Sequence, residues 1–391
     1  IRRVIVSDRE RPKTLPVPLV CLTDSRRGSA AVRNRGGGLI IYTSGSTGNP
    51  KGVRLHSDQA LWSADVLARQ IDAGPRDKYL SLLPLPMLLE LICGIVIPIL
   101  VGGAVYYETA IAENVGSGVP SDLLEAFERV DPTTSVVVPQ LLALYTMQLA
   151  AAKKRASAGL RFIAVGGAAV PSALARNARA LGIPVYEGYG LSECSSVVAV
   201  NTPFAAMEGT VGKPLPGLEV AIEDGEIVVR GPSVMNGYLH GPETNGVWRT
   251  GDVGSLNAQG FLTVSGRKDN LIVTPFGRNL SPEWIETLVL GDPRVGACVL
   301  SQAGEPPTLV LLVIPSRLGD VWFRSAKQEA VSELISAALN DAPNYARPRT
   351  ISILSREEAL ARQLFTANGR PRRLEIQKYL QDEAPTFEVQ G

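Results

Sequence analysis

The sequence predicts an α/β protein with a large N-terminal domain, built mostly on parallel strands with a β-rich end, and a small α+β C-terminal domain. Two observations lead to this prediction. Through the first two-thirds of the chain, short apolar runs alternate with amphipathic helical stretches, which is typical of buried parallel strands joined by helices. After Gly209 the pattern changes to paired strands, and the 391 residues are more than one hydrophobic core usually serves.

In the first domain, a buried strand is expected to run into a glycine-rich loop. Three apolar runs predict strands, at residues 39–42, 136–138 and 162–165. Three amphipathic stretches predict helices, at residues 123–130, 140–152 and 171–182. In the last of these helices, Pro171 marks the start and Gly182 marks the end, as each residue type favours.

The β-rich end is expected to contain two hairpins. Residues 219–222 and 226–229 flank Asp224-Gly225, a dipeptide typical of tight hairpin turns, and a second pair flanks residues 258–260. The C-terminal block contains strand and helix patterns at residues 282 onward, 295–300, 308–314 and 325–338. We therefore expect domains at residues 1–265 and 266–391.

Charge and composition argue against several kinds of protein. The formal net charge is +1, from 39 Lys and Arg against 38 Asp and Glu, so no nucleic-acid partner is expected. The four cysteines are scattered without a C-x-x-C pair, which favours a reducing compartment, and we expect a cytoplasmic protein. Two histidines are too few for a multi-histidine metal centre.

One stretch resembles a membrane span in its composition. Residues 82–107 are apolar except for Glu90, but three prolines and three glycines interrupt them. Because a spanning helix needs about 20 predominantly apolar residues, we expect a buried strand–loop–helix segment and no transmembrane segment. Residues 1–6 read as a charged edge and a short strand rather than as a signal peptide.

The strongest local signal is the loop at residues 42–52, Tyr-Thr-Ser-Gly-Ser-Thr-Gly-Asn-Pro-Lys-Gly. Its glycines let backbone N–H groups approach an anion, and its hydroxyls and Lys51 supply further donors for phosphate oxygens. It is not a Walker A loop, because Pro50 precedes Lys51 and Gly52 follows it. So many hydroxyls and glycines directly after a buried strand would be costly without a ligand, which favours a phosphate-binding loop over a flexible surface turn.

This loop resembles the phosphate-binding signature of the adenylate-forming (AMP-binding) ligases, which include acyl- and aryl-CoA synthetases, luciferases and the adenylation domains of peptide synthetases. Five further motifs match in the family's order: Gly166-Gly167-Ala168, Gly188-Tyr189-Gly190-Leu191-Ser192-Glu193, Trp248-Arg249-Thr250-Gly251-Asp252, Gly266-Arg267-Lys268-Asp269 and Asn368-Gly369-Arg370. Each motif alone is weak, but six in the right order leave little room for coincidence.

The resemblance implies roles for these residues. The expected catalytic residues are Lys51, Thr47, Glu193 and Arg370, and Glu193 would also hold magnesium. The expected nucleotide-binding residues are Thr43, Ser44, Gly45, Ser46, Thr47, Gly48, Lys51, Gly167, Ala168, Gly188, Tyr189, Gly190, Ser192, Asp252 and Arg267. Tyr189 would pack on adenine, and Asp252 would bind the ribose hydroxyls. Asp269 is the expected hinge, and the expected acyl pocket includes Met87, Gly166 and Gly190.

Two departures from the family pattern concern single side chains. Arg370 stands where relatives usually carry a lysine that bridges the substrate carboxylate and the α-phosphate. Arginine carries a planar guanidinium group where lysine carries an ammonium group. Three interpretations stay open: adenylation is slowed, Arg372 or Arg373 substitutes for the lysine, or Arg370 only binds phosphate electrostatically. Met87 replaces a histidine or aromatic residue, which indicates either an apolar acyl group or simple core packing.

Two further departures concern segments. In relatives, a small turn after the hinge lines the channel for the pantetheine thiol, and here Pro275 and Phe276 add bulk to it. This favours adenylation over thioester formation with coenzyme A. The phosphate loop also begins early in the chain, so we expect much of the usual N-terminal subdomain to be missing from it.

The resemblance implies that ATP and Mg²⁺ are used to activate a small-molecule carboxylic acid as acyl-AMP. The acyl group would then pass to a thiol, first of all that of coenzyme A, as in acyl-CoA synthetases of fatty acid metabolism. The expected pocket has no acidic residue apart from Glu187, which favours a fatty or aryl acid over an amino acid. Two alternatives stay open: an enzyme that loads the phosphopantetheine of an acyl carrier protein, and a degenerate nucleotide-binding homologue with weak or no ligase activity.

Overall fold

The computed structural model describes residues 5–6, 37–44, 50–114, 121–273, 278–340, 342–366 and 371–389. The chain divides into two compact units. The first consists of residues 1–168, 177–250 and 255–263, and the second of residues 264–391 with the short pieces 169–176 and 251–254. The two units are described separately below.

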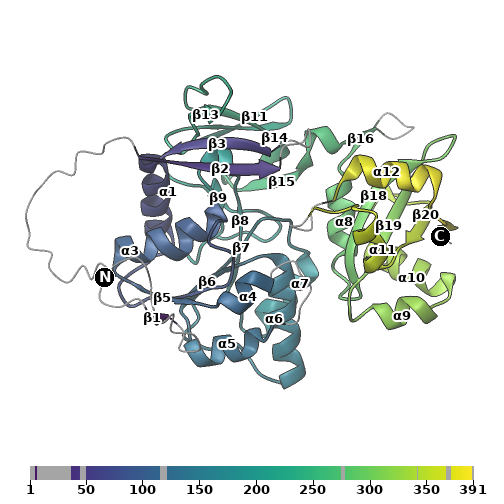
Figure 1. Ribbon diagram of the computed structural model, residues 1–391, viewed down its shortest axis with the longest axis horizontal. Helices are drawn as coiled ribbons and strands as arrows, with labels where there is room; N and C mark the ends of the chain where they lie inside the picture. The colour runs from purple at the N-terminus through teal and green to yellow at the C-terminus, as the bar shows by residue number, and fades with distance from the viewer. Residues whose placement is uncertain are drawn as a thin grey trace, which may run out of the picture. The chain divides into compact units, whose positions relative to one another are not determined.

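The first unit is built on an eight-stranded sheet (Figure 1). In sheet order its strands are β1 (Ile5–Val6), β5 (Ala104–Tyr107), β4 (Lys78–Ser81), β6 (Thr134–Val137), β7 (Phe162–Val165), β8 (Val185–Tyr189), β9 (Ala199–Val200) and β10 (Lys213–Pro214). Neighbours pair in parallel from β1 to β8, and β9 and β10 are antiparallel. This confirms the predicted α/β architecture with mostly parallel strands.

Helices join these strands. They are α1 (Ser57–Gln70), α4 (Thr109–Asn114), α5 (Leu123–Val130), α6 (Pro139–Ala152) and α7 (Ser172–Ala180). Of these, α5, α6 and α7 agree closely with the three helices predicted in this unit. The apolar face of α5 packs on α6, where the rings of Phe127 and Tyr145 stack with centroids 4.1 Å apart. The ring of Tyr145 therefore packs against α5.

The stretch at residues 82–107, predicted as a strand, a loop and a helix, contains a loop and helices, but its strand, β5, follows the helices. After β4, the chain forms α2 (Leu88–Glu90), a π-helical turn (Leu91–Val96) and α3 (Ile97–Val101) before entering β5. Throughout the described ranges, no helix combines the length and hydropathy that a membrane crossing requires.

The predicted strand at residues 39–42 forms, but its predicted burial is wrong. It belongs to β2 (Gly38–Ser44), which pairs antiparallel with β3 (Pro50–His56), and β3 pairs with β13 (Gly237–Tyr238). Successive side chains of a strand point to opposite faces, and one face of this hairpin is open. Ile40 and Tyr42 on that face are therefore 50% and 64% exposed.

The predicted β-rich end is a four-stranded sheet in the order β11 (Glu219–Glu223), β12 (Glu226–Arg230), β14 (Val247–Leu256) and β15 (Leu262–Arg267). The turn between β11 and β12 has φ angles of 51° at Asp224 and 77° at Gly225. Both angles lie in the left-handed region that a two-residue hairpin turn requires, which explains the Asp-Gly dipeptide. Both predicted hairpins are confirmed.

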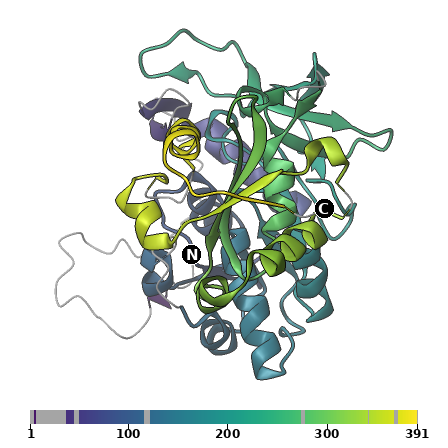
Figure 2. The ribbon, with the colours of Figure 1, turned by 90° about the vertical axis from the view of Figure 1, so that its right-hand side faces the viewer.

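The second unit contains a sheet in the order β18 (Val295–Ala303), β19 (Thr308–Pro315), β20 (Thr350–Ile353) and β21 (Phe387–Glu388). Figure 2 shows its strands with helices on either side. The helices are α8 (Pro282–Val289), α9 (Asp320–Ser325), α10 (Gln328–Ala338), α11 (Arg356–Ala361) and α12 (Arg373–Asp382). The helix predicted at residues 325–338 is confirmed as α10, which begins at Gln328, and Ser325 is the last residue of the separate helix α9.

Each face of this sheet has its own core. Alternate residues of β19 point to opposite faces, so Leu309, Leu311 and Val313 pack with α8 and α10. The residues between and after them, Val310, Leu312 and Ile314, pack with α11 and α12. The short elements at the start of this unit are the 3₁₀ turn Lys268–Asn270, β16 (Ile272–Val273) and β17 (Asn279–Leu280), and a second 3₁₀ turn lies at Asn344–Ala346.

Candidate active site

Two of the predicted motifs meet at the carboxyl ends of β7 and β8. Gly166-Gly167-Ala168 follows β7, and Gly188 and Tyr189 end β8. These strands are adjacent and parallel, so the motifs share one edge of the sheet, which is where α/β sheets bind ligands. A Cβ atom on Gly166 would lie 3.5 Å from the Gly188 carbonyl oxygen and 4.0 Å from Leu89 Cδ2.

Of the predicted acyl-pocket residues, Gly166 is buried and lies beside Leu89, which the sequence did not single out. Met87 precedes α2 and is 36% exposed, which argues against simple core packing. This exposure leaves its thioether free to contact an apolar ligand.

Gly190 and the turn after Glu193 form a tightly constrained part of the site. A Cβ atom on Gly190 would lie 1.5 Å from the Ser196 carbonyl oxygen, so only glycine fits. Ser195 and Ser196 have φ angles of 53° and 84°, and their buried hydroxyls have no hydrogen-bond partner in the described part of the chain. Such strain clusters at functional sites. The sequence does not predict this strained turn, because serine, unlike glycine, is not typical of a left-handed backbone.

Tyr238 brings together two predicted catalytic residues that are far apart in the sequence. Its hydroxyl donates a hydrogen bond to Glu193 Oε1 over 2.9 Å, and Lys51 Nζ lies 5.4 Å from the centroid of its ring. All three side chains are half-buried and therefore accessible to a ligand. Sequence reasoning missed Tyr238, because it lies outside the motifs that were recognised.

Backbone hydrogen bonds fix the segment that carries Tyr238. The N–H of Met235 donates to Glu193 O over 2.8 Å, and the N–H of Leu239 donates to Gly52 O over 2.7 Å. Between these bonds, β13 pairs with β3, and Gly237 has a φ of 123° with Pro242 O 2.2 Å from its hypothetical Cβ. The segment is thus fastened on one side to Glu193 and on the other to the strand of Lys51.

Trp248, from another predicted motif, supports the Tyr238 ring. The two rings meet edge to face with centroids 5.7 Å apart and planes at 83°. The buried Trp248 Nε1 has no hydrogen-bond partner within the described residues. The edge-to-face contact between the two rings restrains the orientation of Tyr238.

The predicted phosphate loop is described only at its two ends. Thr43 Oγ1 donates to the Lys51 carbonyl oxygen over 3.5 Å, and Ser44 pairs with Pro50 at the end of the β2–β3 ladder. Gly45, Ser46, Thr47 and Gly48 lie outside the described residues, as do Arg370 and the segment 274–277 with Pro275 and Phe276. Ala168 and Gly167 are exposed, and Tyr189 and Ser192 are half-buried.

In the second unit, the predicted ribose-binding residues contact each other. Arg267 Nη1 donates to Asp252 Oδ1 over 2.9 Å, and Asp252 is 8% exposed. Asp269 lies in the exposed 3₁₀ turn after Arg267. The next residue, Asn270, donates to Glu283 Oε1 over 2.6 Å, which ties this turn to α8.

Arg373, which the sequence offered as a substitute for the missing lysine, is engaged elsewhere. Its guanidinium makes two hydrogen bonds of 2.8 Å to the carboxylate of Glu286 and one of 3.2 Å to Glu283. It is therefore held by two carboxylates and is not available to a phosphate. Arg372 is exposed and is not held in this way.

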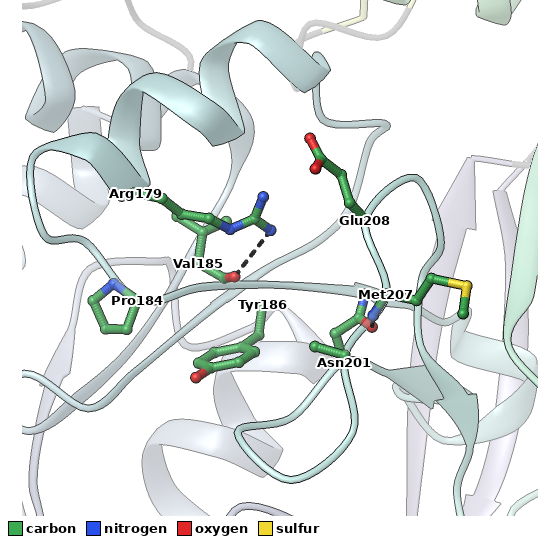
Figure 3. A pocket seen from close by; sticks show the side chains of 8 residues that line it. Arg179, Pro184, Val185, Tyr186, Asn201, Met207 and Glu208 are labelled. Atoms are coloured by element: carbon green, nitrogen blue, oxygen red, sulfur yellow. Dashed lines mark hydrogen bonds between the residues drawn. The ribbon is translucent and has the colours of Figure 1, made fainter.

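A separate pocket of about 210 Å³ lies at the other end of β8 (Figure 3). It is lined by Arg179, Pro184, Val185, Tyr186, Asn201, Ala206, Met207 and Glu208. Nearby, Glu187 Oε1 lies 3.9 Å from Arg179 Nη2. Burial raises the pKa of Glu187 to about 7, and Arg179 opposes the shift. Because Glu187 already has a cationic partner, it is a poor candidate for binding a substrate ammonium.

The side chains that could bind a metal ion suit magnesium bound together with phosphates better than a structural metal site. Among the described residues, no three His, Cys, Asp or Glu side chains converge. Magnesium is commonly bound through one or two carboxylates together with substrate phosphates, and Glu193 can supply one such carboxylate. Cys194, next to it, is fully buried, in agreement with a packing role. Among the described residues, Cys93, Cys194 and Cys298 are buried and none of them is in a disulfide.

Comparison with known proteins agrees with this geometry. A family profile for AMP-binding enzymes matches residues 25–239, and the chain belongs to this family. A 2-succinylbenzoate–CoA ligase of Bacillus velezensis is 32% identical, over 68% of this chain and 56% of the relative. A long-chain-fatty-acid–CoA ligase of Mycobacterium bovis is 30% identical, over 75% of this chain and 57% of the relative. The chain thus spans little more than half the length of these curated relatives.

Solved structures show the same fold. The o-succinylbenzoate CoA synthetase of Bacillus subtilis, in complex with its acyl-adenylate intermediate, matches with a TM-score of 0.71 and 27% identity. The match covers 86% of this chain and 68% of that one. An anthranilate CoA ligase matches with a TM-score of 0.74 at 21% identity, which is evidence for the fold alone. The predicted family and fold class are confirmed.

Proposed function

We propose that the protein activates a carboxylic acid with ATP as acyl-AMP and transfers the acyl group to the thiol of coenzyme A. One observation carries this proposal. Lys51 of the phosphate-loop motif and Glu193 of a distant motif contact the ring and the hydroxyl of the same tyrosine, Tyr238. The cation proposed to bind phosphates and the carboxylate proposed to bind a metal ion thus contact one half-buried tyrosine.

The chemistry requires charge neutralisation. In the first step a carboxylate oxygen attacks the α-phosphorus of ATP, and the bond to pyrophosphate breaks. Both reactants are anions, so the site must screen charge and align the attack. Lys51 would pair with phosphate oxygens, and a magnesium ion held by Glu193 would neutralise further phosphate charge. No covalent nucleophile on the protein is needed.

The predicted roles of the other motif residues are part of this proposal. Thr47 and the rest of the phosphate loop would surround the phosphates, Tyr189 would pack on adenine, and Asp252 with Arg267 would bind the ribose. Arg370 would contact the reacting groups in place of the family's lysine. Asp269 would act as the hinge between the adenylating and thiolating forms.

Coenzyme A is favoured as the acceptor, because the relatives are named CoA ligases. An acyl carrier protein is the alternative acceptor, and the thiol added in the assay decides between them. A fatty or aryl acid is favoured as the substrate. The named substrates of the relatives belong to these classes, Met87 is accessible and apolar, and Glu187 is paired with Arg179. Three buried cysteines that are not in disulfides, among the described residues, support a reducing, cytoplasmic location.

The test is carboxylate-dependent ATP–pyrophosphate exchange with fatty, aryl and amino acids in the presence of magnesium. Exchange is expected with a fatty or aryl acid. Lys51→Ala is expected to lower it by about 100-fold or more, because one preorganised charged donor is lost. Lys213→Ala is the matched control, because Lys213 also lies over an aromatic ring, 4.9 Å from Phe261, but outside the site.

Each result has a clear meaning. Equal loss in the two lysine variants would contradict the role of Lys51. Absence of exchange with every acid, while ATP still binds, would favour the degenerate homologue instead. If exchange occurs, adding coenzyme A or a phosphopantetheinylated carrier protein and following thioester formation identifies the acceptor.

A further inference from the structure

The Tyr238 contacts define an arrangement that the predicted roles do not require. A cation and a carboxylate close enough to share one tyrosine would be expected to pair directly, since unit charges attract strongly in a half-buried site. Within the described ranges, however, Lys51 and Glu193 form no ion pair. Lys51 lies over the ring face of Tyr238, and Glu193 accepts its hydroxyl proton.

We propose that Tyr238 is a positioning residue that presents Glu193 to the metal ion of MgATP and keeps Lys51 apart from Glu193. This inference rests on the proposed function. The Tyr238 hydroxyl donates a hydrogen bond to Oε1 of Glu193. The other carboxylate oxygen, Oε2, has no hydrogen-bond partner in the described part of the chain. One oxygen is thus anchored, and the other is open to a cation.

The surroundings of Tyr238 suit this role. Its backbone is fastened to Glu193 through Met235 and to the Lys51 strand through Leu239. Trp248 makes an edge-to-face contact with its ring and limits rotation. A hydroxyl-to-carboxylate hydrogen bond is charge-assisted and therefore holds the carboxylate firmly. The ring face attracts a cation more weakly, so Lys51 can be released to a phosphate.

The experiment measures the Kd of the full chain for ATP by calorimetric titration, once with excess Mg²⁺ and once with EDTA. The wild type is expected to bind MgATP more tightly than metal-free ATP. Tyr238→Phe is expected to weaken MgATP binding by about tenfold and to leave metal-free ATP binding unchanged, because only the carboxylate anchor is lost. Equal weakening of both forms, or no change in either, would overturn the proposal.

A double-mutant cycle separates positioning from a structural effect. Glu193→Gln removes the metal ligand. In that background, Tyr238→Phe is expected to change the MgATP Kd by less than about twofold, because a residue that acts through Glu193 has nothing left to position. Additive losses would contradict the proposal.

Tyr238→Leu tests the ring. Without the ring, Lys51 is expected to pair with Glu193, so this variant should also lose affinity for metal-free ATP. If it binds both forms of ATP as Tyr238→Phe does, the part of the proposal that concerns Lys51 is wrong.

Tyr79→Phe is the matched control. It also removes a tyrosine hydroxyl that bonds to a glutamate, Glu90, over 3.1 Å, but outside the motifs. The ratio of the two ATP dissociation constants is expected to stay at the wild-type value. A shift as large as that of Tyr238→Phe would mean that general loss of stability explains both effects, and the proposal would fall.

The titration also separates this inference from the proposed function. A wild-type protein that binds MgATP tightly but shows no carboxylate-dependent exchange would refute the ligase activity, and the Tyr238 variants would still decide the inference. A wild-type protein that catalyses exchange but binds MgATP no better than metal-free ATP would refute the inference alone. Failure to bind either form would refute both.

Discussion

Glu90 is a buried carboxyl group that the proposed chemistry does not use. It is 0% exposed and accepts hydrogen bonds from Tyr79 over 3.1 Å and from Ser81 over 2.5 Å. Burial raises its pKa to about 7, and the two hydroxyl donors oppose this shift only in part. The residue lies next to the π-helical turn at Leu91–Val96, a type of turn often found near functional sites.

This pKa predicts a pH-dependent stability. Because the folded-state pKa of about 7 lies above the reference value of 4.5, the folded state binds more protons between these pH values. The contribution of Glu90 to stability therefore falls as pH rises through this window and stays low above it. Glu90→Gln should remove the dependence. As the pH rises from acidic to alkaline, the free energy of unfolding of the variant should therefore increase by about 3 kcal/mol relative to that of the wild type.

Urea unfolding of both proteins at several pH values measures this difference. Glu128→Gln is the control, because Glu128 is an exposed surface residue paired with Lys154. Its stability relative to the wild type is expected to be nearly independent of pH. Parallel pH profiles for wild type and Glu90→Gln would show that Glu90 is not the group that titrates.

At the scale of elements, one buried ion pair joins α8 to α12. Arg373, the first residue of α12, holds Glu286 of α8 through two hydrogen bonds of 2.8 Å. Burial raises the pKa of Glu286, and the guanidinium of Arg373 opposes the shift. Removal of the arginine would leave a buried carboxylate without its partner.

Arg373→Gln is therefore expected to destabilise the second unit by about 3 kcal/mol or more, as for other broken buried pairs. Because the pKa of Glu286 then rises further, the loss should be larger at pH 8 than at pH 5. Arg362→Gln is the matched control, since the exposed Arg362–Glu383 pair should contribute less than about 1 kcal/mol. Equal losses in the two variants, measured by urea unfolding, would show that burial does not decide the cost.

The elements also differ in how well their sequences predict them. The bounds of α5 and of the β11–β12 hairpin follow from residues 123–130 and from Asp224-Gly225, because helix periodicity and turn chemistry are local. The helix α9 escaped prediction, because a helix of 6 residues is too short to show a clear apolar periodicity. The exposure of β2 escaped prediction because burial depends on the partners of a strand.

At the scale of the whole molecule, each unit has a hydrophobic core of its own. The two clusters on the β18–β21 sheet consist only of residues of the second unit, and Glu90 lies in the first. Units with separate cores can unfold separately. We expect two transitions in differential scanning calorimetry.

Two substitutions show which unit unfolds in each transition. Arg373→Gln should lower the midpoint of one transition by roughly 5–10 °C, and Glu90→Gln at alkaline pH should raise only the other. A single transition that both substitutions displace would contradict independent unfolding.

The sequence by itself determined the family, the α/β architecture and most of the nucleotide-binding motifs. These are local patterns: glycines where a backbone must turn or approach an anion, and apolar periods that match a strand or a helix. The tertiary structure alone decided which distant side chains meet. Tyr238 between Lys51 and Glu193, Arg373 against Glu286, and the burial of Glu90 depend on strand order and on the packing of residues far apart in the chain. No local pattern encodes such contacts, because they exist only after the chain has folded.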